Sequence, residues 1–302
     1  MSIEKEIYTI ISKEMKSLLN KMVNDFSDNY DKKEYNWLIA EFSPTTLSYM
    51  VLVSSLESKY GNMFEKIARQ ICELTYGKEN VPSTIKGVGI SDEEYNSHIM
   101  DFDKQKQYII SKFHKIDNAS SLSKFRAEHE GHGRGKNKVP STLTQSELPK
   151  LLNNDFKKSD EIQEQEVDLV FYDKFEDKWK IFEIKAGGAL DSSNAPQNVI
   201  KMLKIYSSLG DKNANLYFAT LYHKNGEGNT WDGAVKKHLG EDCILIGKEF
   251  WKQVLRDISY EDLLKIYKKV FEDIGFEDVL NELITETARN SLNQEYQSKL
   301  PI

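Results

Sequence analysis

The sequence predicts a mixed α/β fold, equally describable as α+β, in which a central mixed β-sheet lies between a helical N-terminal region and a helical C-terminal tail. Three observations predict it. Apolar residues recur at helical spacing near both ends of the chain, short strand-like runs gather within residues 166–246, and an amphipathic segment separates two of those runs. Because strands and helices are unevenly distributed along the chain, a regular strand–helix alternation is not expected.

The N-terminal region, residues 1–115, is expected to be helical and to pack on the core. Isoleucine, methionine and leucine recur every three or four residues through residues 2–30, which predicts the first helix. Ser43 and Pro44 then supply a cap and a first residue for a second helix.

Glycines mark the next boundaries. Gly61 is expected to begin a third helix, which stops at Gly77. Residues 78–97 contain proline, glycine and an acidic cluster and predict a loop, whereas residues 98–114 predict a further helix.

The core is assigned to residues 161–257 and begins with two strand-like runs. Residues 166–171 form an apolar, β-branched run that contains Asp168, and residues 180–185 alternate apolar and charged side chains. The polar residues between the runs predict a turn, so the runs are expected to pair as an antiparallel hairpin.

The elements after the hairpin complete the core and the C-terminal tail. An amphipathic helix is expected at about residues 195–209, strands at 214–222 and 243–246, and a short helix after Gly247. The last region, residues 258–302, predicts two helices, from Tyr260 to about Ile274 and from Glu277 to about Tyr296.

Pairing of the two runs brings Asp168 near Glu183 and Lys185 on one face. Two carboxylates on rigid strands can bind a hard divalent cation through oxygen. A lysine beside them can orient a water for attack on phosphorus, which points to a nuclease. The alternative is a half-solvated strand whose charges form an ordinary cross-strand ion pair.

The residues EIKAGG at 183–188, the glutamine-bearing helix after them and ILIGKEFW at 244–251 carry a family resemblance. The stretch from Glu166 to Leu255 resembles the type II restriction endonucleases of the PD-(D/E)xK superfamily. More narrowly, it is similar to the enzymes that cut interrupted palindromes of the GGNCC kind. The first acidic residue follows Val167 instead of proline, a replacement that the resembled family tolerates.

The resemblance implies a central mixed sheet of the PD-(D/E)xK nuclease type. It also implies that Asp168 and Glu183 hold Mg²⁺ and that Lys185 lies near the attacking water. The substrate would be double-stranded DNA, cut at a short palindrome by a homodimer, because protein and site then share a two-fold axis.

Two further carboxylates are candidates for the same site. Glu65 lies in YGNMFEKIA at 60–68, which resembles the helix that precedes the core in that group, and it is assigned to the catalytic residues; a solvated charge is the alternative. Glu166 is two residues before Asp168 and would share its strand face, although the solvated start of a strand is favoured for it.

Residues 116–160 form a basic, glycine-rich loop region. The part from Ala127 to Lys138 almost lacks apolar residues and is expected to be a mobile surface loop. A basic loop can order on DNA, so its cations are candidate contacts to phosphate or guanine, with a solvated loop as the alternative. The predicted DNA-binding residues are these cations and two residues on the polar side of the 195–209 helix: Arg126, Arg134, Lys136, Lys138, Gln197 and Lys201.

Composition sets limits on the location and partners. The chain has 302 residues, of which 39% are hydrophobic and 29% charged, and no apolar run could span a membrane. The N-terminus lacks the layout of a signal peptide, and two distant cysteines fit the reducing cytoplasm. A net charge of −7 argues against a passive coat on nucleic acid, but a local basic patch still permits DNA binding.

Two other functions remain open at this stage. Another PD-(D/E)xK nuclease, with repair or structure-specific activity, would need neither a dimer nor a defined site. A non-catalytic DNA-binding protein with a decayed core is the second, but the intact Asp168, Glu183 and Lys185 disfavour it.

Overall fold

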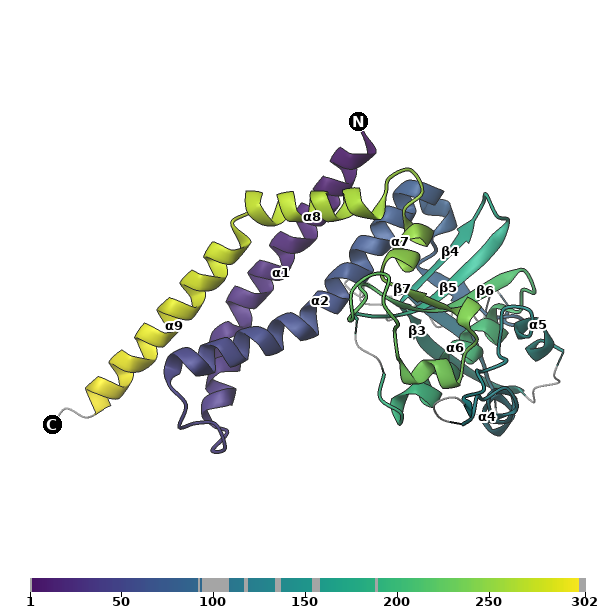
Figure 1. Ribbon diagram of the computed structural model, residues 1–302, viewed down its shortest axis with the longest axis horizontal. Helices are drawn as coiled ribbons and strands as arrows, with labels where there is room; N and C mark the ends of the chain where they lie inside the picture. The colour runs from purple at the N-terminus through teal and green to yellow at the C-terminus, as the bar shows by residue number, and fades with distance from the viewer. Residues whose placement is uncertain are drawn as a thin grey trace. The chain divides into compact units, whose positions relative to one another are not determined.

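The computed structural model describes residues 2–91, 93, 109–116, 119–133, 137–153, 158–187 and 190–298. It divides into a helical unit (residues 1–67 and 257–302) and a sheet unit (residues 68–256), and Figure 1 labels helices and strands of each. The predicted α/β class is confirmed, with a mixed four-stranded sheet and helices at both ends of the chain. None of the helices in the described ranges is long and apolar enough to cross a membrane.

Long amphipathic helices make up the helical unit. They are α1 (Ile3–Glu34), the first part of α2 (Pro44–Tyr76), α8 (Tyr260–Asp273) and α9 (Phe276–Ser298). Helix α1 packs on α8 and α9 and buries Ile7 and Ile11. Ser259 caps α8, because its hydroxyl accepts a hydrogen bond from the amide of Asp262. The two predicted C-terminal helices are therefore confirmed.

Helix α2 corrects the prediction of two helices separated at Gly61. It runs without interruption from Pro44 to Tyr76, with Gly61 inside it. A single glycine lowers helix stability by only about 1 kcal/mol, which neighbouring turns offset. The predicted end at Gly77 is confirmed, since this residue has a φ of +98° that favours glycine.

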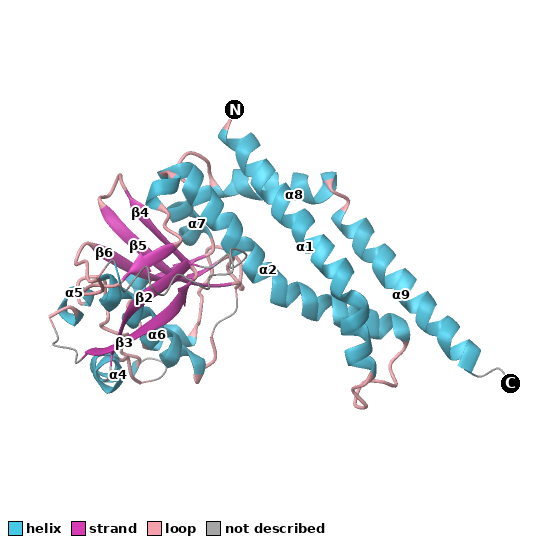
Figure 2. Ribbon diagram, turned by 180° about the vertical axis from the view of Figure 1, so that it is seen from behind, coloured by secondary structure: helices cyan, strands magenta, loops and turns pink. Residues whose placement is uncertain are grey.

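Two sheets form the sheet unit (Figure 2). The first has the order β1-β2-β3, with β1 (Thr84–Lys86), β2 (Ile109–Ile116) and β3 (Lys158–Val167). The second has the order β4-β5-β6-β7, with β4 (Leu169–Asp173), β5 (Lys178–Lys185), β6 (Ala214–Thr220) and β7 (Ile244–Ile246). Strands β4 and β5 form the predicted antiparallel hairpin, and β5, β6 and β7 are parallel.

Two strand assignments differ from the sequence prediction. Residues 109–114, predicted as helix, belong to β2, which pairs antiparallel with β3 over a long register; residues 98–108 lie outside the described residues. The predicted run 166–171 is also not one strand, because the chain bends at Asp168 and passes from β3 to β4 in another sheet. Long-range pairing overrides local propensity at both places.

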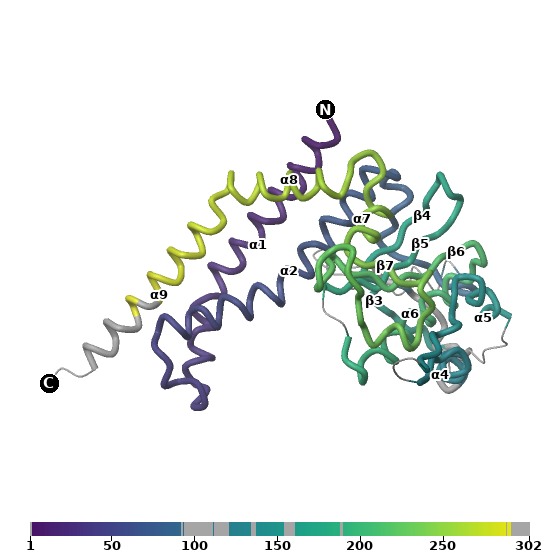
Figure 3. The backbone as a smooth tube through the Cα atoms, in the orientation of Figure 1, coloured from purple at the N-terminus to yellow at the C-terminus, as the bar shows by residue number. Residues whose placement is uncertain are grey.

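Helix α6 (Asn194–Leu209) contacts strands of both sheets, and the backbone leads from β5 through α6 into β6 (Figure 3). Its buried face includes Val199, Leu203 and Tyr206. Strand β6 and helix α7 (Lys248–Val254) follow as predicted. The remaining short elements are α4 (Ala119–Glu128), α5 (Leu148–Leu151), η1 (Lys78–Asn80), η3 (Ala234–Lys237) and η4 (Glu241–Cys243).

The basic region is less irregular than its composition predicts. Helix α4 extends to Glu128, so Arg126 lies in a helix and not in a loop. Beyond the helix, Gly131 donates a 2.8 Å hydrogen bond to the carbonyl of Lys237, and His132 pairs with Val139 in an antiparallel bridge. Backbone hydrogen bonds therefore hold the described part of the segment.

Candidate active site at the bend between the two sheets

Asp168 is fixed at the bend by its neighbours and by one hydrogen bond. Val167 and Leu169 on either side are fully or almost fully buried, which anchors the backbone of the bend in the core. The backbone amide of Ile184 donates a 2.7 Å hydrogen bond to Oδ2 of Asp168. The carboxylate is therefore held against the end of β5.

Strand β5 presents the second carboxylate and a lysine. Glu183 and Lys185 are two residues apart and so lie on the same face of the strand. The Nζ of Lys185 is 2.6 Å from Oε1 of Glu183 and 3.8 Å from Oδ2 of Asp168. The structure thus brings the three residues together as the hairpin pattern predicted.

Helix α6 adds Lys201 to this group. Its Nζ lies 2.6 Å from Oε2 of Glu183 and 3.6 Å from Oδ1 of Asp168. The sequence predicts Lys201 on a DNA-binding helix face and does not predict this position. The available signal was its place beside the buried face of an amphipathic helix, where a lysine requires an anionic partner.

The group of Asp168, Glu183, Lys185 and Lys201, named here the open cluster, is partly buried. The Glu183 side chain is 2% exposed, whereas that of Lys185 is 34% exposed. Burial raises the pKa of Asp168, and the negative charge of Glu183 raises it further, against the two lysines. Burial alone would lower the pKa of Lys201, but the two carboxylates raise it.

The oxygen atoms of the open cluster suit a hard cation. Each carboxylate already contacts both ammonium groups, so the oxygens of Asp168 and Glu183 converge on shared positive charge. Within the described part of the chain, no three His, Cys, Asp or Glu residues converge on one point. Two carboxylates are sufficient for Mg²⁺, which keeps several of its waters.

Comparison with known proteins identifies the family. The family model of the type II restriction endonuclease HinfI matches residues 3–271. The chain belongs to the HinfI family of type II restriction endonucleases. No curated protein and no solved structure matches it. Family membership makes this enzyme a site-specific deoxyribonuclease that acts on DNA.

The sequence predicts two other carboxylates as candidates for the active site of this restriction endonuclease. Glu65 is a half-buried residue of α2 in the helical unit, and its assignment to the active site stays a prediction. Glu166 is exposed on β3 opposite Ile110. Because the chain bends at Asp168, Glu166 and Asp168 do not belong to one strand. The expectation that they share a strand face is therefore not met.

The predicted DNA-binding residues have different surroundings. Arg126 is half-buried, with Nη1 2.7 Å from Oε2 of Glu130 and 2.7 Å from Nδ1 of His238. Lys138 and Gln197 are exposed. Arg134 and Lys136 lie outside the described residues.

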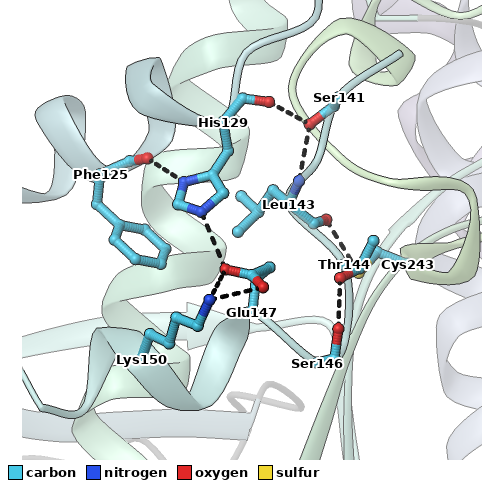
Figure 4. A network of polar contacts seen from close by, with 9 residues as sticks. All are labelled: Phe125, His129, Ser141, Leu143, Thr144, Ser146, Glu147, Lys150 and Cys243. Carbon is cyan, nitrogen blue, oxygen red and sulfur yellow. Dashed lines mark hydrogen bonds and ion pairs between the residues drawn. The ribbon is translucent and has the colours of Figure 1, made fainter.

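His129 belongs to a polar network between α4 and the segment after it (Figure 4). Its Nδ1 is 2.8 Å from the carbonyl of Phe125, and its Nε2 is 3.4 Å from Oε2 of Glu147. Ser141 donates a hydrogen bond to the His129 carbonyl and accepts one from the amide of Leu143. These contacts make His129 part of the scaffold that shapes the chain after α4.

Proposed function

We propose that this restriction endonuclease hydrolyses phosphodiester bonds of duplex DNA through a PD-(D/E)xK site formed by Asp168, Glu183 and Lys185. The proposal rests on the convergence of both carboxylates and the lysine where the bend at Asp168 meets the end of β5. Lys185 is one-third exposed, so its ammonium is accessible to a water or a DNA phosphate. The family match supports DNA as the substrate.

Asp168 and Glu183 would hold Mg²⁺, which supplies stabilisation of negative charge and a water of lowered pKa when bound. The protein's own groups do the remaining work. Lys185 orients the attacking water and the reacting phosphate. Lys201 positions the carboxylate of Glu183 through their 2.6 Å contact, and the Ile184 amide positions Asp168.

The proposed metal dependence is tested by digestion of a plasmid of known sequence. Cleavage should stop in EDTA and return with Mg²⁺ or Mn²⁺. Ca²⁺ should support DNA binding with little cleavage, because its looser coordination positions water poorly. Full cleavage in EDTA would exclude the metal assignment.

We further propose that a homodimer cuts a short interrupted palindrome in which G·C pairs flank an unspecified centre, as in GGNCC. Guanine presents two major-groove acceptors to arginine or lysine, worth about 1–3 kcal/mol of discrimination for each good pair. A two-fold dimer applies each contact twice. A DNA substrate and two buried free cysteines support a location in the reducing cytoplasm.

The recognition sequence is determined by mapping the ends of digested DNA. The oligomeric state is measured by sedimentation equilibrium with and without DNA. Ends that share a symmetric motif support the restriction proposal. Ends scattered without a motif would favour a repair or structure-specific nuclease and leave the metal site untouched.

A further inference from the structure

We propose that a second site of the sheet unit, a basic pocket of about 250 Å³, binds a backbone phosphate of the DNA substrate. The proposal rests on the proposed function and names a contact that holds the substrate. The pocket shares no residue with the open cluster. Its lining residues are Gly131, His132, Gly133, Lys138, Val139, Ser192, Gly233, Ala234, Lys236, Lys237 and His238.

The charge of the lining points to an anion. Three of the described lining residues are lysines and none of them is acidic, although the chain has 48 acidic residues against 41 lysines and arginines. Lys237 is neutralised by Glu130, whose Oε1 lies 2.6 Å from its Nζ. Lys138 and Lys236 make no ion pair within the described part of the chain, so their charge is available to a ligand.

His238 does not add to this charge at neutral pH. Its Nδ1 lies 2.7 Å from Nη1 of Arg126. Burial lowers the pKa of His238, and the adjacent Arg126 lowers it further. The net positive charge of the pocket therefore comes from Lys138 and Lys236.

The wall of the pocket is held in place by backbone contacts. The amide of Gly131 donates to the Lys237 carbonyl, and the His132 and Val139 backbones exchange two hydrogen bonds of 3.0 and 2.7 Å. A Cβ on Gly131 would stand 2.6 Å from the Val139 carbonyl oxygen, so the close approach of these segments requires glycine. A wall fixed before binding reduces the entropy cost of holding a ligand.

Ser192 connects the pocket to the catalytic elements. It lies in the short connection between β5, which ends at Lys185, and α6, which carries Lys201. At the start of α6, the Asp191 carboxylate accepts hydrogen bonds from the amides of Ser193 and Asn194. A phosphate in the pocket is thus held by the same connection that joins the two catalytic elements.

The lining favours phosphate over a base. Among the described residues, no phenylalanine, tyrosine or tryptophan lines the pocket, so they offer no platform on which a base would stack. Lysine ammonium groups bind phosphate as point charges and carry no sequence information.

The test compares Lys138→Ala/Lys236→Ala with Lys174→Ala/Lys252→Ala, a control that removes the same charge at exposed positions of the sheet unit. Affinity for a duplex oligonucleotide is measured in EDTA, where the proposed chemistry is blocked, at several salt concentrations. The double variant removes both free lysines of one phosphate contact, so it should reduce the magnitude of the slope of log K against log[salt] by about 0.9. The control slope should be unchanged.

A pocket variant with the slope and affinity of the wild type would overturn the proposal. So would weakened binding at one DNA sequence only, because phosphate contacts weaken binding uniformly across sequences. Thermal melting shows whether the variant is folded, and Lys138→Gln/Lys236→Gln provides a second form. Loss of cleavage by the wild type in Mg²⁺, with the salt slopes as expected, would contradict the proposed function and leave the phosphate site supported.

Discussion

Strand β5 carries two clusters of lysine and carboxylate that differ in exposure. Near its start, Lys180 contacts Asp173, Glu176 and Gln253 at 2.8, 2.9 and 2.7 Å, and its side chain is only 1% exposed. This closed cluster uses all three N–H donors of the ammonium. At the other end of the strand, the lysines of the open cluster are 34% and 23% exposed.

The comparison separates a structural role from a chemical one. The ammonium of Lys180 is saturated and almost fully buried, so a phosphate cannot reach it without breaking contacts. In the open cluster each carboxylate is shared between two lysines whose charged ends are accessible. Charge pattern alone does not separate the two clusters, because both consist of acidic residues and lysines. The two clusters are separated by the exposed fraction of their lysine side chains and by whether all N–H donors of the ammonium are used.

The largest expected effect is on stability, at the closed cluster. Asp173→Ala leaves the buried ammonium of Lys180 without its buried anionic partner, which should cost about 3–5 kcal/mol of unfolding free energy. Urea unfolding followed by tryptophan fluorescence measures it, since Trp179, Trp231 and Trp251 lie in the sheet unit. Asp232→Ala, at an exposed position, is the control. Equal losses of unfolding free energy in Asp173→Ala and Asp232→Ala would contradict a structural role of the closed cluster.

The next effect is on turnover, at the open cluster. Lys185→Ala should reduce kcat on the order of 100-fold, the scale for a lost acid–base or electrostatic group. DNA affinity should change far less, because phosphate contacts elsewhere supply most of it. Single-turnover cleavage and binding in Ca²⁺ separate the two quantities. Near-normal turnover would mean that another residue orients the water.

A smaller effect is expected for Lys201. Lys201→Ala should lower activity about 10-fold, within the range for partners that orient a metal ligand. The loss should appear as a higher Mg²⁺ requirement, because Glu183 loses its 2.6 Å contact, and Lys201→Arg should restore part of it. Unchanged Mg²⁺ dependence in the alanine variant would exclude a positioning role through Glu183.

Local pattern predicted the hairpin, both C-terminal helices, α6 and the meeting of Asp168, Glu183 and Lys185, because each follows from residues close in sequence. It could not predict contacts that depend on tertiary packing. Lys201 reaches Glu183 only because α6 packs against both sheets. The same limit explains β2, which is a strand through its pairing with β3.

Asp173 shows this limit inside the hairpin itself. It was assigned to a polar turn, yet its side chain is 2% exposed. Its ion-pair partner is the ammonium of Lys180 across the hairpin. Gln253 of α7 accepts a hydrogen bond from the same ammonium. In the sequence, a solvated turn residue and a buried ion-pair partner look the same. Only tertiary packing distinguishes them, here the position of α7.

The smallest expected effect is on the pH dependence of stability. Burial alone would raise the pKa of Asp173, but the hydrogen bond from Lys180 and the amides of Phe175 and Glu176 lower it below its usual value. A lowered pKa means that ionised Asp173 stabilises the fold above pH about 4 and that this stabilisation is lost as the pH falls through the folded-state pKa. Asp173→Asn should therefore flatten the fall in unfolding free energy below pH 4. Asp168→Asn, measured alongside in EDTA, should not flatten it, because burial and Glu183 raise the pKa of Asp168. Parallel curves for wild type and Asp173→Asn would show that the closed cluster contributes nothing to acid sensitivity.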